Sequence, residues 1–507
     1  MAKTVNELLG EALTEVQASA IDNIVHSKNI KPQHRTLLIK NGYLKTIIKG
    51  WYLLDADLST QKAGESALWY ESVWSFIGQY LFYRFDDNYW LGPEASLNIH
   101  TDNNSMPPQI VVFVKGGTED IAKLPNNMSI MVTRSNAKPD GLVEHRGVNV
   151  YSLEAALVNS VPIYYKNNQV SILLALKNAD LDKLAEAMLR SKNITSAGRI
   201  IGAYEALEMR AESKKLEIIM TGVFENIKVK NPFADVPIIF REKRKEAASA
   251  SRIRIMWQQM RQVILERFEK INPEFNFYSI PIDETLNKVN EIYVNDAYNS
   301  LSIEGYKVTP ELIERVSHGD WSPETIEQDK VTKDTLAARG YYDAFNTVKE
   351  SLTEAHKKED ISYLVDVGIT AWSTALFTPC VAAGIISEIN LAGYRKGPIY
   401  IRGSRHVPPA SEQLMDCMTA LKECIAEEES FAVKAVLGHL FFGYVHPYFD
   451  GNGRTARFLM NFLFIIGGYK WVVIKLETRE EYLAALESAS VGKDITQFAD
   501  FILDTIK

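Results

Sequence analysis

A polar segment from His446 to Arg457 holds the side chains of this sequence that could do chemistry together. His446 can accept a proton near neutral pH, and Asp450 offers hard carboxylate oxygens of the kind that Mg²⁺ binds. Arg454 and Arg457 are three residues apart, so they share one face of a helix. Guanidinium groups hold phosphate oxygens through paired hydrogen bonds, so these four side chains together predict phosphate chemistry.

The same segment also predicts a backbone site for an anion. Gly451 and Gly453 flank Asn452, and glycine adopts backbone angles that other residues resist. The turn can therefore direct several N–H groups toward one point, and a helix that begins there aims its positive end at the same point. The pattern predicts a triphosphate cradle with a general base. It is not a P-loop, because the sequence has no GxxxxGK(S/T) motif.

The elements on either side of this segment explain how it is held. The runs 432–444 and 458–466 are apolar at helical spacing, so the segment is a short polar loop between two buried helices. Another helix, beginning near Asp283, ends at Gly305, with Glu304 close to its C-terminus. A carboxylate there faces the unfavourable pole of the helix dipole and needs a cationic partner. An ordinary exposed glutamate is the alternative.

One further stretch of the C-terminal half has strand character. The stretch from Tyr394 to Ser404 alternates around Ile399 and Ile401 and is bounded by glycines. This pattern predicts a β-hairpin.

Bulk properties limit the class of protein. The chain has 507 residues, 46% hydrophobic and 24% charged, with a net charge of −8, so we expect about three or four domains in an ordinary soluble protein. Three cysteines without a CxxC pattern are typical of a reducing cytoplasm. We expect neither a signal peptide nor a membrane partner, since no apolar run reaches about 18 residues.

The N-terminal region predicts a winged helix-turn-helix over residues 1–60. Two helices are followed by two short strands about a turn, and between His26 and Gly50 there are lysines and an arginine but no Asp or Glu. Such a cationic face suits phosphate contacts, and the candidate DNA contacts are Lys31, Arg35, Lys45 and Lys49. A protein-binding module is the alternative, because winged helices serve both purposes.

Residues 61–237 predict a small mixed α/β region followed by helices. Strand-like runs occur at 109–114, 129–134 and 148–152, and the stretch 172–225 is helical in pattern. An arginine-rich helix then begins near Arg241 and predicts a solvated helical linker over 238–282, with a second nucleic-acid patch as the alternative.

The polar loop matches the Fic family motif HPxx(D/E)GNGRxxR along its whole length, and residues 283–507 resemble a Fic domain. The resemblance implies a mainly α chain, with an all-helical Fic domain that carries a β-hairpin flap. It also implies transfer of AMP from ATP, with Mg²⁺, to a Ser, Thr or Tyr hydroxyl of a target protein. By resemblance, the base is His446, the Mg²⁺ ligand is Asp450, the α- and β-phosphates contact Gly451, Asn452 and Gly453, and the β- and γ-phosphates contact Arg454 and Arg457. The flap residues Ile399, Tyr400 and Ile401 would add a strand to the target.

The helix end from Ser300 to Gly305 matches the motif (S/T)xxxE(G/N) of the family's inhibitory helix. The resemblance implies that Glu304 pairs with Arg457. That pair would occupy the γ-phosphate site and leave ATP in a pose unsuited to in-line attack.

Residues 1–237 resemble the abortive-infection antitoxin family of toxin–antitoxin systems, through the segments KNGYLKTIIKGWYLLD and WLGPEASL. This resemblance implies a half that binds DNA or a protein partner. Two other functions stay open: a DNA-binding regulator whose Fic half senses a nucleotide, and an enzyme that removes AMP from proteins. The sequence names neither the target nor the nucleobase, and it leaves the oligomeric state open, with a homodimer among the options.

Overall fold

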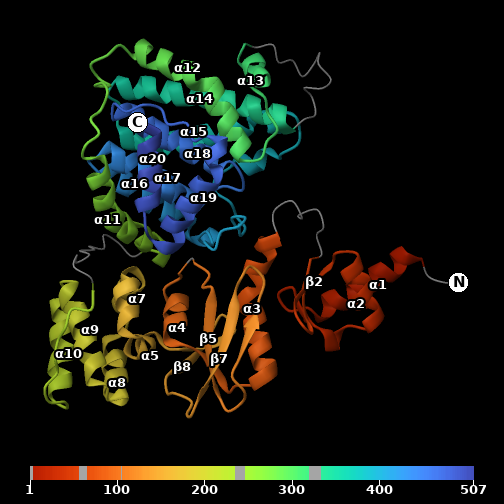
Figure 1. The fold of residues 1–507 in the computed structure, drawn as a ribbon, viewed down its shortest axis with the longest axis vertical. Coiled ribbons are helices and arrows are strands. Elements are labelled where there is room, and N and C mark those ends of the chain that lie inside the picture. The colour runs from red at the N-terminus through yellow and green to blue at the C-terminus, as the bar shows by residue number, and fades with distance from the viewer. Residues whose placement is uncertain (1–3, 56–64, 104, 234–245, 319–332, 507) are drawn as a thin grey trace. The chain divides into compact units, whose positions relative to one another are not determined.

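The computed structural model describes residues 4–55, 65–103, 105–233, 246–318 and 333–506. The chain divides into two compact units (Figure 1). The first comprises Met1–Arg241 with Tyr400–Val407, and the second comprises Glu242–Ile399 with Pro408–Lys507. The boundary passes through the predicted flap, so Ile399 belongs to the second unit and Tyr400 to the first.

The first unit begins with a small module of helices and strands. Thr4 starts the first helix with a capping box, in which its side chain and that of Glu7 satisfy each other's backbone N–H groups. Pro32 occupies the first turn of the second helix, where proline is favoured. The strands form an antiparallel sheet of order β1-β3-β2. The elements are α1 (Val5–Ser19), β1 (Ile24–His26), α2 (Pro32–Lys40), β2 (Leu44–Ile48) and β3 (Trp51–Leu54).

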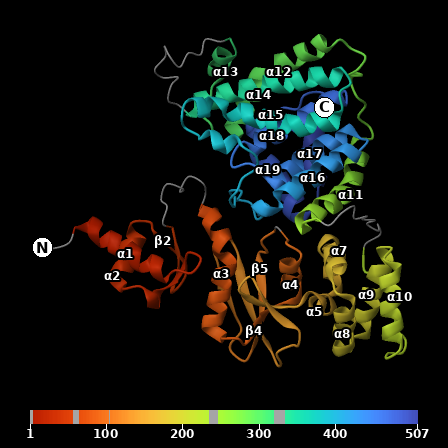
Figure 2. The same ribbon diagram turned by 180° about the vertical axis from the view of Figure 1, so that it is seen from behind.

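A four-stranded mixed sheet of order β4-β5-β7-β6 follows. β5 and β7 are parallel, whereas β4 and β6 are antiparallel to their neighbours, and β8 pairs with β9 as a separate hairpin. Two helices, α3 and α4, flank the strands (Figures 1 and 2). The bounds are α3 (Glu65–Phe85), β4 (Tyr89–Leu91), α4 (Pro93–His100), β5 (Gln109–Lys115), β6 (Asp120–Lys123), β7 (Ser129–Ser135), β8 (Leu142–His145) and β9 (Val148–Tyr151).

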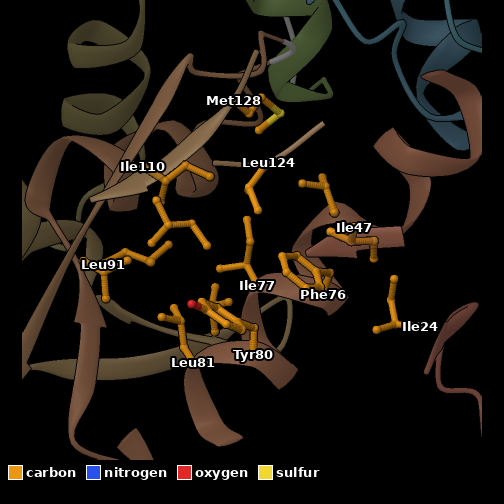
Figure 3. Close-up of a cluster of buried hydrophobic side chains, with 14 of the residues drawn as sticks. Ile24, Ile47, Phe76, Ile77, Tyr80, Leu81, Leu91, Ile110, Leu124 and Met128 are labelled. Carbon is orange, nitrogen blue, oxygen red and sulfur yellow. The ribbon is translucent and has the colours of Figure 1, made fainter. Parts of the chain in front are cut away.

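One hydrophobic core joins the module to this sheet (Figure 3). Ile24 and Ile47 from the module lie in the same buried cluster as Phe76 from α3 and Ile110 from β5. The ring of Trp51 meets the ring of Phe76 edge to face at 5.9 Å. The module is therefore packed against α3 through apolar side chains.

The helical stretch predicted after the sheet is present, divided into short helices. Asp180 and Asn193 begin two of them by accepting hydrogen bonds from free backbone N–H groups. The helices are α5 (Leu153–Asn159), α6 (Pro162–Asn167), α7 (Gln169–Asn178), α8 (Leu181–Ser191), α9 (Ile194–Ala206) and α10 (Arg210–Thr221).

The second unit is a helical bundle, drawn in green to blue in Figure 1, and the prediction of a mainly α chain is confirmed. α18 lies at its centre, in contact with α14, α15 and α17. The helices are α11 (Ala248–Phe268), α12 (Ile282–Ile303), α13 (Pro310–Ser317), α14 (Lys333–His356), α15 (Ile361–Ala382), α16 (Leu414–Glu427), α17 (Phe431–Val445), α18 (Asn452–Ile466), α19 (Arg479–Glu487) and α20 (Thr496–Ile506).

The helix that the sequence suggested as a solvated linker is a core helix. α11 contacts α16, α17 and α20, and Trp257 is buried. Its arginines meet acidic side chains: Arg254 pairs with Glu246 at 3.1 Å, and Arg261 pairs with Glu428 at 2.6 Å. The positive charges that suggested solvent exposure are thus neutralised within the unit. The predicted start at 241–245 lies outside the described residues.

Among the described helices, α15 alone is long and apolar enough to cross a membrane, with a mean hydropathy of 1.4 over its best window. Half of that window is buried, and the helix packs against α14, α16 and α18. These contacts are those of a core helix within a bundle.

The segment from Tyr394 to Ser404 differs from the predicted hairpin. Within the described part of the chain it forms no two-stranded ladder; Ser404 closes a turn onto the carbonyl of Ile401 at 3.1 Å. Within the first unit, the ring of Tyr400 stacks on Tyr70 at 6.1 Å, and His406 forms a single β-bridge with Ser105. Alternating isoleucines predict extended backbone, but a strand also needs a neighbour along its whole length.

Candidate active site

The polar loop joins α17 to α18 through two residues with positive φ. His446 ends α17 with φ 51°, and Gly451 precedes α18 with φ 77°. Pro447 follows His446 and cannot continue the helix. A non-glycine residue with positive φ is uncommon, and such strain is concentrated at functional sites.

His446 is half-buried and arranged as a base. Its Nδ1 lies 3.1 Å from the carbonyl oxygen of Gly443. This contact assigns the proton to Nδ1, which leaves the lone pair on Nε2. Burial lowers the pKa of His446 below its usual value. The imidazole is therefore neutral near pH 7 and able to accept a proton.

The turn of the loop is stabilised by Asn452. Its side-chain oxygen accepts from the backbone N of Tyr448 at 3.0 Å, and its amide donates to the backbone oxygen of Tyr448 at 2.7 Å. The side chain thus shapes the loop, and only the backbone N–H of Asn452 remains for an anion. A Cβ at Gly451 would lie 2.7 Å from the ring of Phe377, so glycine is required there by space as well as by φ.

Arg454 is buried between two aromatic rings. Its guanidinium carbon lies 5.0 Å from the ring centre of Tyr306 and 5.3 Å from that of Phe377. One terminal nitrogen is 3.3 Å from both the Tyr306 hydroxyl and Oδ1 of Asp450. Nε has no hydrogen-bond partner among the described residues. Burial acts to lower the pKa of Arg454, but neighbouring Tyr306 and Asp450 raise it overall, so the charge is retained.

Arg457 is 3% exposed and is held by the end of α12. Nε donates to the hydroxyl of Ser300 at 2.8 Å, and a terminal nitrogen donates to the backbone oxygen of Ser300 at 3.1 Å and to Oε1 of Glu304 at 2.9 Å. Burial acts to lower the pKa of Arg457, but Glu304 raises it overall. The cationic partner that Glu304 needed is therefore present.

Glu304 also lies directly over the start of α18. A Cβ at Gly453 would come within 2.2 Å of Oε1 of Glu304. The carboxylate thus lies at the positive end of a helix, where a phosphate group would bind.

Asp450 is the only loop carboxylate. Its side chain is 56% exposed, and Oδ1 accepts from the backbone N of Gly451 at 2.6 Å. No group of three or more His, Cys, Asp or Glu side chains in the described residues could hold a metal ion. A single exposed carboxylate suits Mg²⁺, which is commonly bound through one or two carboxylates and the phosphates of a substrate.

Sequence reasoning missed Arg395, which supports the loop from the segment predicted as a flap. This side chain is 3% exposed and donates to the carbonyl oxygens of His446 at 2.9 Å, Gly397 at 2.8 Å and Pro409 at 2.5 Å. The sequence carried no signal for this role, because binding to three carbonyl groups depends on how distant segments meet.

Of the predicted flap residues, Ile399 alone belongs to the same unit as the polar loop. Tyr400 and Ile401 belong to the first unit. Among the predicted DNA contacts, Lys31 lies 3.7 Å from Glu15 and Lys45 lies 3.1 Å from Asp55, whereas Lys49 is exposed. The prediction considered acidic residues only between 26 and 50, but the acidic partners of Lys31 and Lys45 lie outside that range.

One comparison with known proteins covers the polar loop. Residues 381–464 match the model of the Fic/DOC family, and this match contains the whole polar loop.

The chain is similar to proteins described as protein adenylyltransferase Fic. The protein from Nematostella vectensis is 26% identical over 253 residues, covering 48% of this chain and 54% of that protein. The protein from Culex quinquefasciatus is 27% identical over 257 residues, covering 47% and 46%. The chain thus spans about half the length of these curated relatives.

The chain is also similar to solved structures. A Fic domain containing signaling protein from Bacteroides thetaiotaomicron is 16% identical, with a TM-score of 0.36, over 50% of this chain and 92% of that one. Fic-1 from C. elegans is 17% identical, with a TM-score of 0.34, over 70% and 87%.

Proposed function

We propose that this chain is an auto-inhibited protein adenylyltransferase, which transfers AMP from ATP to a Ser, Thr or Tyr hydroxyl of a target protein. One observation carries the proposal. A base, a helix N-terminus and two buried arginines converge on one loop, and a glutamate from α12 lies on the site where phosphate would bind.

The reaction follows from the positions of the loop groups. The hydroxyl oxygen attacks the α-phosphorus of ATP while Nε2 of His446 takes the hydroxyl proton. The new bond joins oxygen to the α-phosphorus, and the bond to the bridging oxygen breaks to release pyrophosphate. Backbone N–H groups at the start of α18 and the guanidinium groups of Arg454 and Arg457 hold the phosphates in line. Mg²⁺ held by Asp450 would neutralise phosphate charge.

Inhibition follows from the contact between Glu304 and Arg457. The carboxylate accepts the hydrogen bond from Arg457 that a γ-phosphate oxygen would otherwise accept. ATP can then bind only with its triphosphate displaced, so that the pyrophosphate leaving group is not opposite the acceptor hydroxyl.

Labelling with ATP that carries the label on its α-phosphate tests the proposal. Glu304→Gly is expected to label a protein substrate, or itself, at least about tenfold faster than wild type, because Arg457 is released for the γ-phosphate. Glu304→Gly combined with His446→Ala is expected to show no labelling. Glu359→Gly, at an exposed loop glutamate, is the matched control and should behave as wild type. Labelling that persists without His446 would exclude it as the base.

A second function, DNA binding by the N-terminal module, is favoured by its element order. The order of α1, β1, α2, β2 and β3, with a terminal hairpin, resembles that of a winged helix, which supports this second proposal. Lys49 is exposed at the hairpin. We infer that this face contacts the phosphate groups of DNA. The chain would then be a DNA-binding regulator whose Fic half senses a nucleotide.

A further inference from the structure

The turn after α12 presents two side chains to the loop. The backbone N of Gly305 donates to the carbonyl of Ser302 at 3.0 Å, and that of Tyr306 donates to the carbonyl of Leu301 at 3.1 Å. This pair of bonds is a Schellman motif, and Gly305 supplies the positive φ, 86°, that the motif needs. Glu304 and Tyr306 therefore leave the same rigid turn, and each meets a different arginine of α18.

Arg454 packs against Tyr306, but Tyr306 does not fully satisfy the hydrogen-bond donors of the guanidinium group. The hydrogen bond from Arg454 to the Tyr306 hydroxyl is 3.3 Å long, whereas bonds from a guanidinium to an anionic oxygen are about 2.7–2.9 Å. Nε of Arg454 is buried with no partner among the described residues. Burial also raises the pKa of Tyr306, so its hydroxyl is neutral at pH 7. The phenol is thus a weak, neutral substitute for a phosphate oxygen.

Neighbouring groups keep Tyr306 in place. The Nζ of Lys333 lies 5.4 Å from the ring centre of Tyr306, on a ring that also contacts Arg454. The backbone N of Lys307 donates to Asp334 at 3.1 Å, which fixes the chain just after the turn. The position of the ring is therefore set by α14 as well as by α12.

We propose that Tyr306 is a second inhibitory residue, which occupies Arg454 as Glu304 occupies Arg457. This inference rests on the proposed function of the loop. Its consequence is that the β- and γ-phosphates of ATP must displace both side chains. Because both belong to one turn, a single movement of the end of α12 releases both arginines.

Binding of ATP and AMP by the full chain, measured by isothermal titration calorimetry, tests this role. Tyr306→Phe removes the hydroxyl and keeps the ring. Losing one neutral hydrogen bond to the competing side chain should lower the Kd for ATP about two- to tenfold. The Kd for AMP should stay unchanged, because AMP lacks the phosphates that Arg454 would bind. Tyr363→Phe, at a tyrosine that is 57% exposed on α15, is the matched control.

Each outcome decides the question. A higher Kd for ATP would overturn the proposal and make Tyr306 a residue that orients Arg454 for phosphate. Equal changes for ATP and AMP, or no change, would also overturn it. Tyr306→Ala, checked for an unchanged melting temperature, should tighten ATP binding at least as much as Tyr306→Phe. Labelling by Glu304→Gly reports separately on the transfer reaction, so a failure there with tighter ATP binding here would leave the Tyr306 contact standing.

Discussion

The sequence singled out two regions by their charge: the polar loop, and the basic face of the N-terminal module (Lys31, Arg35, Lys45 and Lys49). The cations of the two regions differ in burial and in their partners. Arg454 and Arg457 are 1% and 3% exposed, and each contacts groups fixed by other helices. Lys31 and Lys45 have side chains 62% and 31% exposed and pair with a nearby carboxylate.

The difference shows how much structural information each charge pattern carried. A buried charge must be paired and hydrogen-bonded, so it fixes the positions of its partners. An exposed lysine such as Lys31 imposes no such geometry, and its ion pairs contribute about 0–1 kcal/mol. The loop pattern therefore specified a site, whereas the basic face specified only a local charge.

If buried charges fix the site and exposed ones do not, the largest loss of stability is expected for Arg395→Met, at a buried arginine. Its removal leaves the carbonyl groups of His446, Gly397 and Pro409 without this donor, and the bond to Pro409 is buried. A buried acceptor left without a donor costs about 1–3 kcal/mol. The free energy of unfolding, measured in urea, should fall by about 2–4 kcal/mol, and labelling in the Glu304→Gly background should fall with it.

Arg402→Met is the control for this change, because Arg402 is exposed in the same segment. Equal losses for the two variants would mean that Arg395 does not support the loop.

Asp296 is a second buried ionisable residue, after Arg395, on which the contrast can be tested. It lies on α12, one turn before Ser300. Tyr341 donates to its Oδ2 at 2.7 Å, and burial raises the pKa of Asp296 from 3.8 to about 6. Because the folded value is the higher one, ionisation of Asp296 opposes folding. The penalty is absent below about pH 4, grows as pH rises, and is complete above about pH 6.

Asp296→Asn removes this penalty and keeps an oxygen that can accept from Tyr341. Its stability relative to wild type should therefore rise by about 3 kcal/mol between pH 4 and pH 7, as measured by urea unfolding across that range. Asp283→Asn, at an exposed position of the same helix, should show no such trend. A difference independent of pH would show that Asp296 stays ionised in the fold.

The smallest effect on stability is expected in the basic face. Lys49→Gln should change the free energy of unfolding by less than about 1 kcal/mol. Lys45→Gln should cost more than Lys49→Gln, because it removes the partner of the buried Asp55. If this face binds DNA, a band shift on the chain's own promoter should weaken, and the slope of log K against log salt should fall by about 1 for each phosphate that the variant no longer neutralises. Lys123→Gln, at an exposed lysine of β6, serves as the control. Unchanged shifts and slopes would assign the module to a protein partner.

Prediction from the sequence succeeded where the signal was local. The apolar runs around the loop gave α17 and α18, and Gly305 marked the end of α12, because helix periodicity and capping depend on neighbouring residues. It failed for α11, whose arginines suggested solvent but pair with Glu246 and Glu428. It also failed for the hairpin at Ile399, since strand pairing depends on a partner that the sequence does not name.

The sequence by itself determined the polar loop: a histidine, a carboxylate, two glycines and two arginines at fixed spacing, with a glutamate at a distant helix end. The pairing of Glu304 with Arg457, which the resemblance implied, is confirmed by the structure. Only the tertiary structure decided that Tyr306 contacts Arg454 and that Arg395 donates to the carbonyl of His446. The physical reason is that spacing along one helix fixes which residues share a face. Contacts between helices depend on how the bundle packs, and that packing is set by apolar side chains throughout the unit.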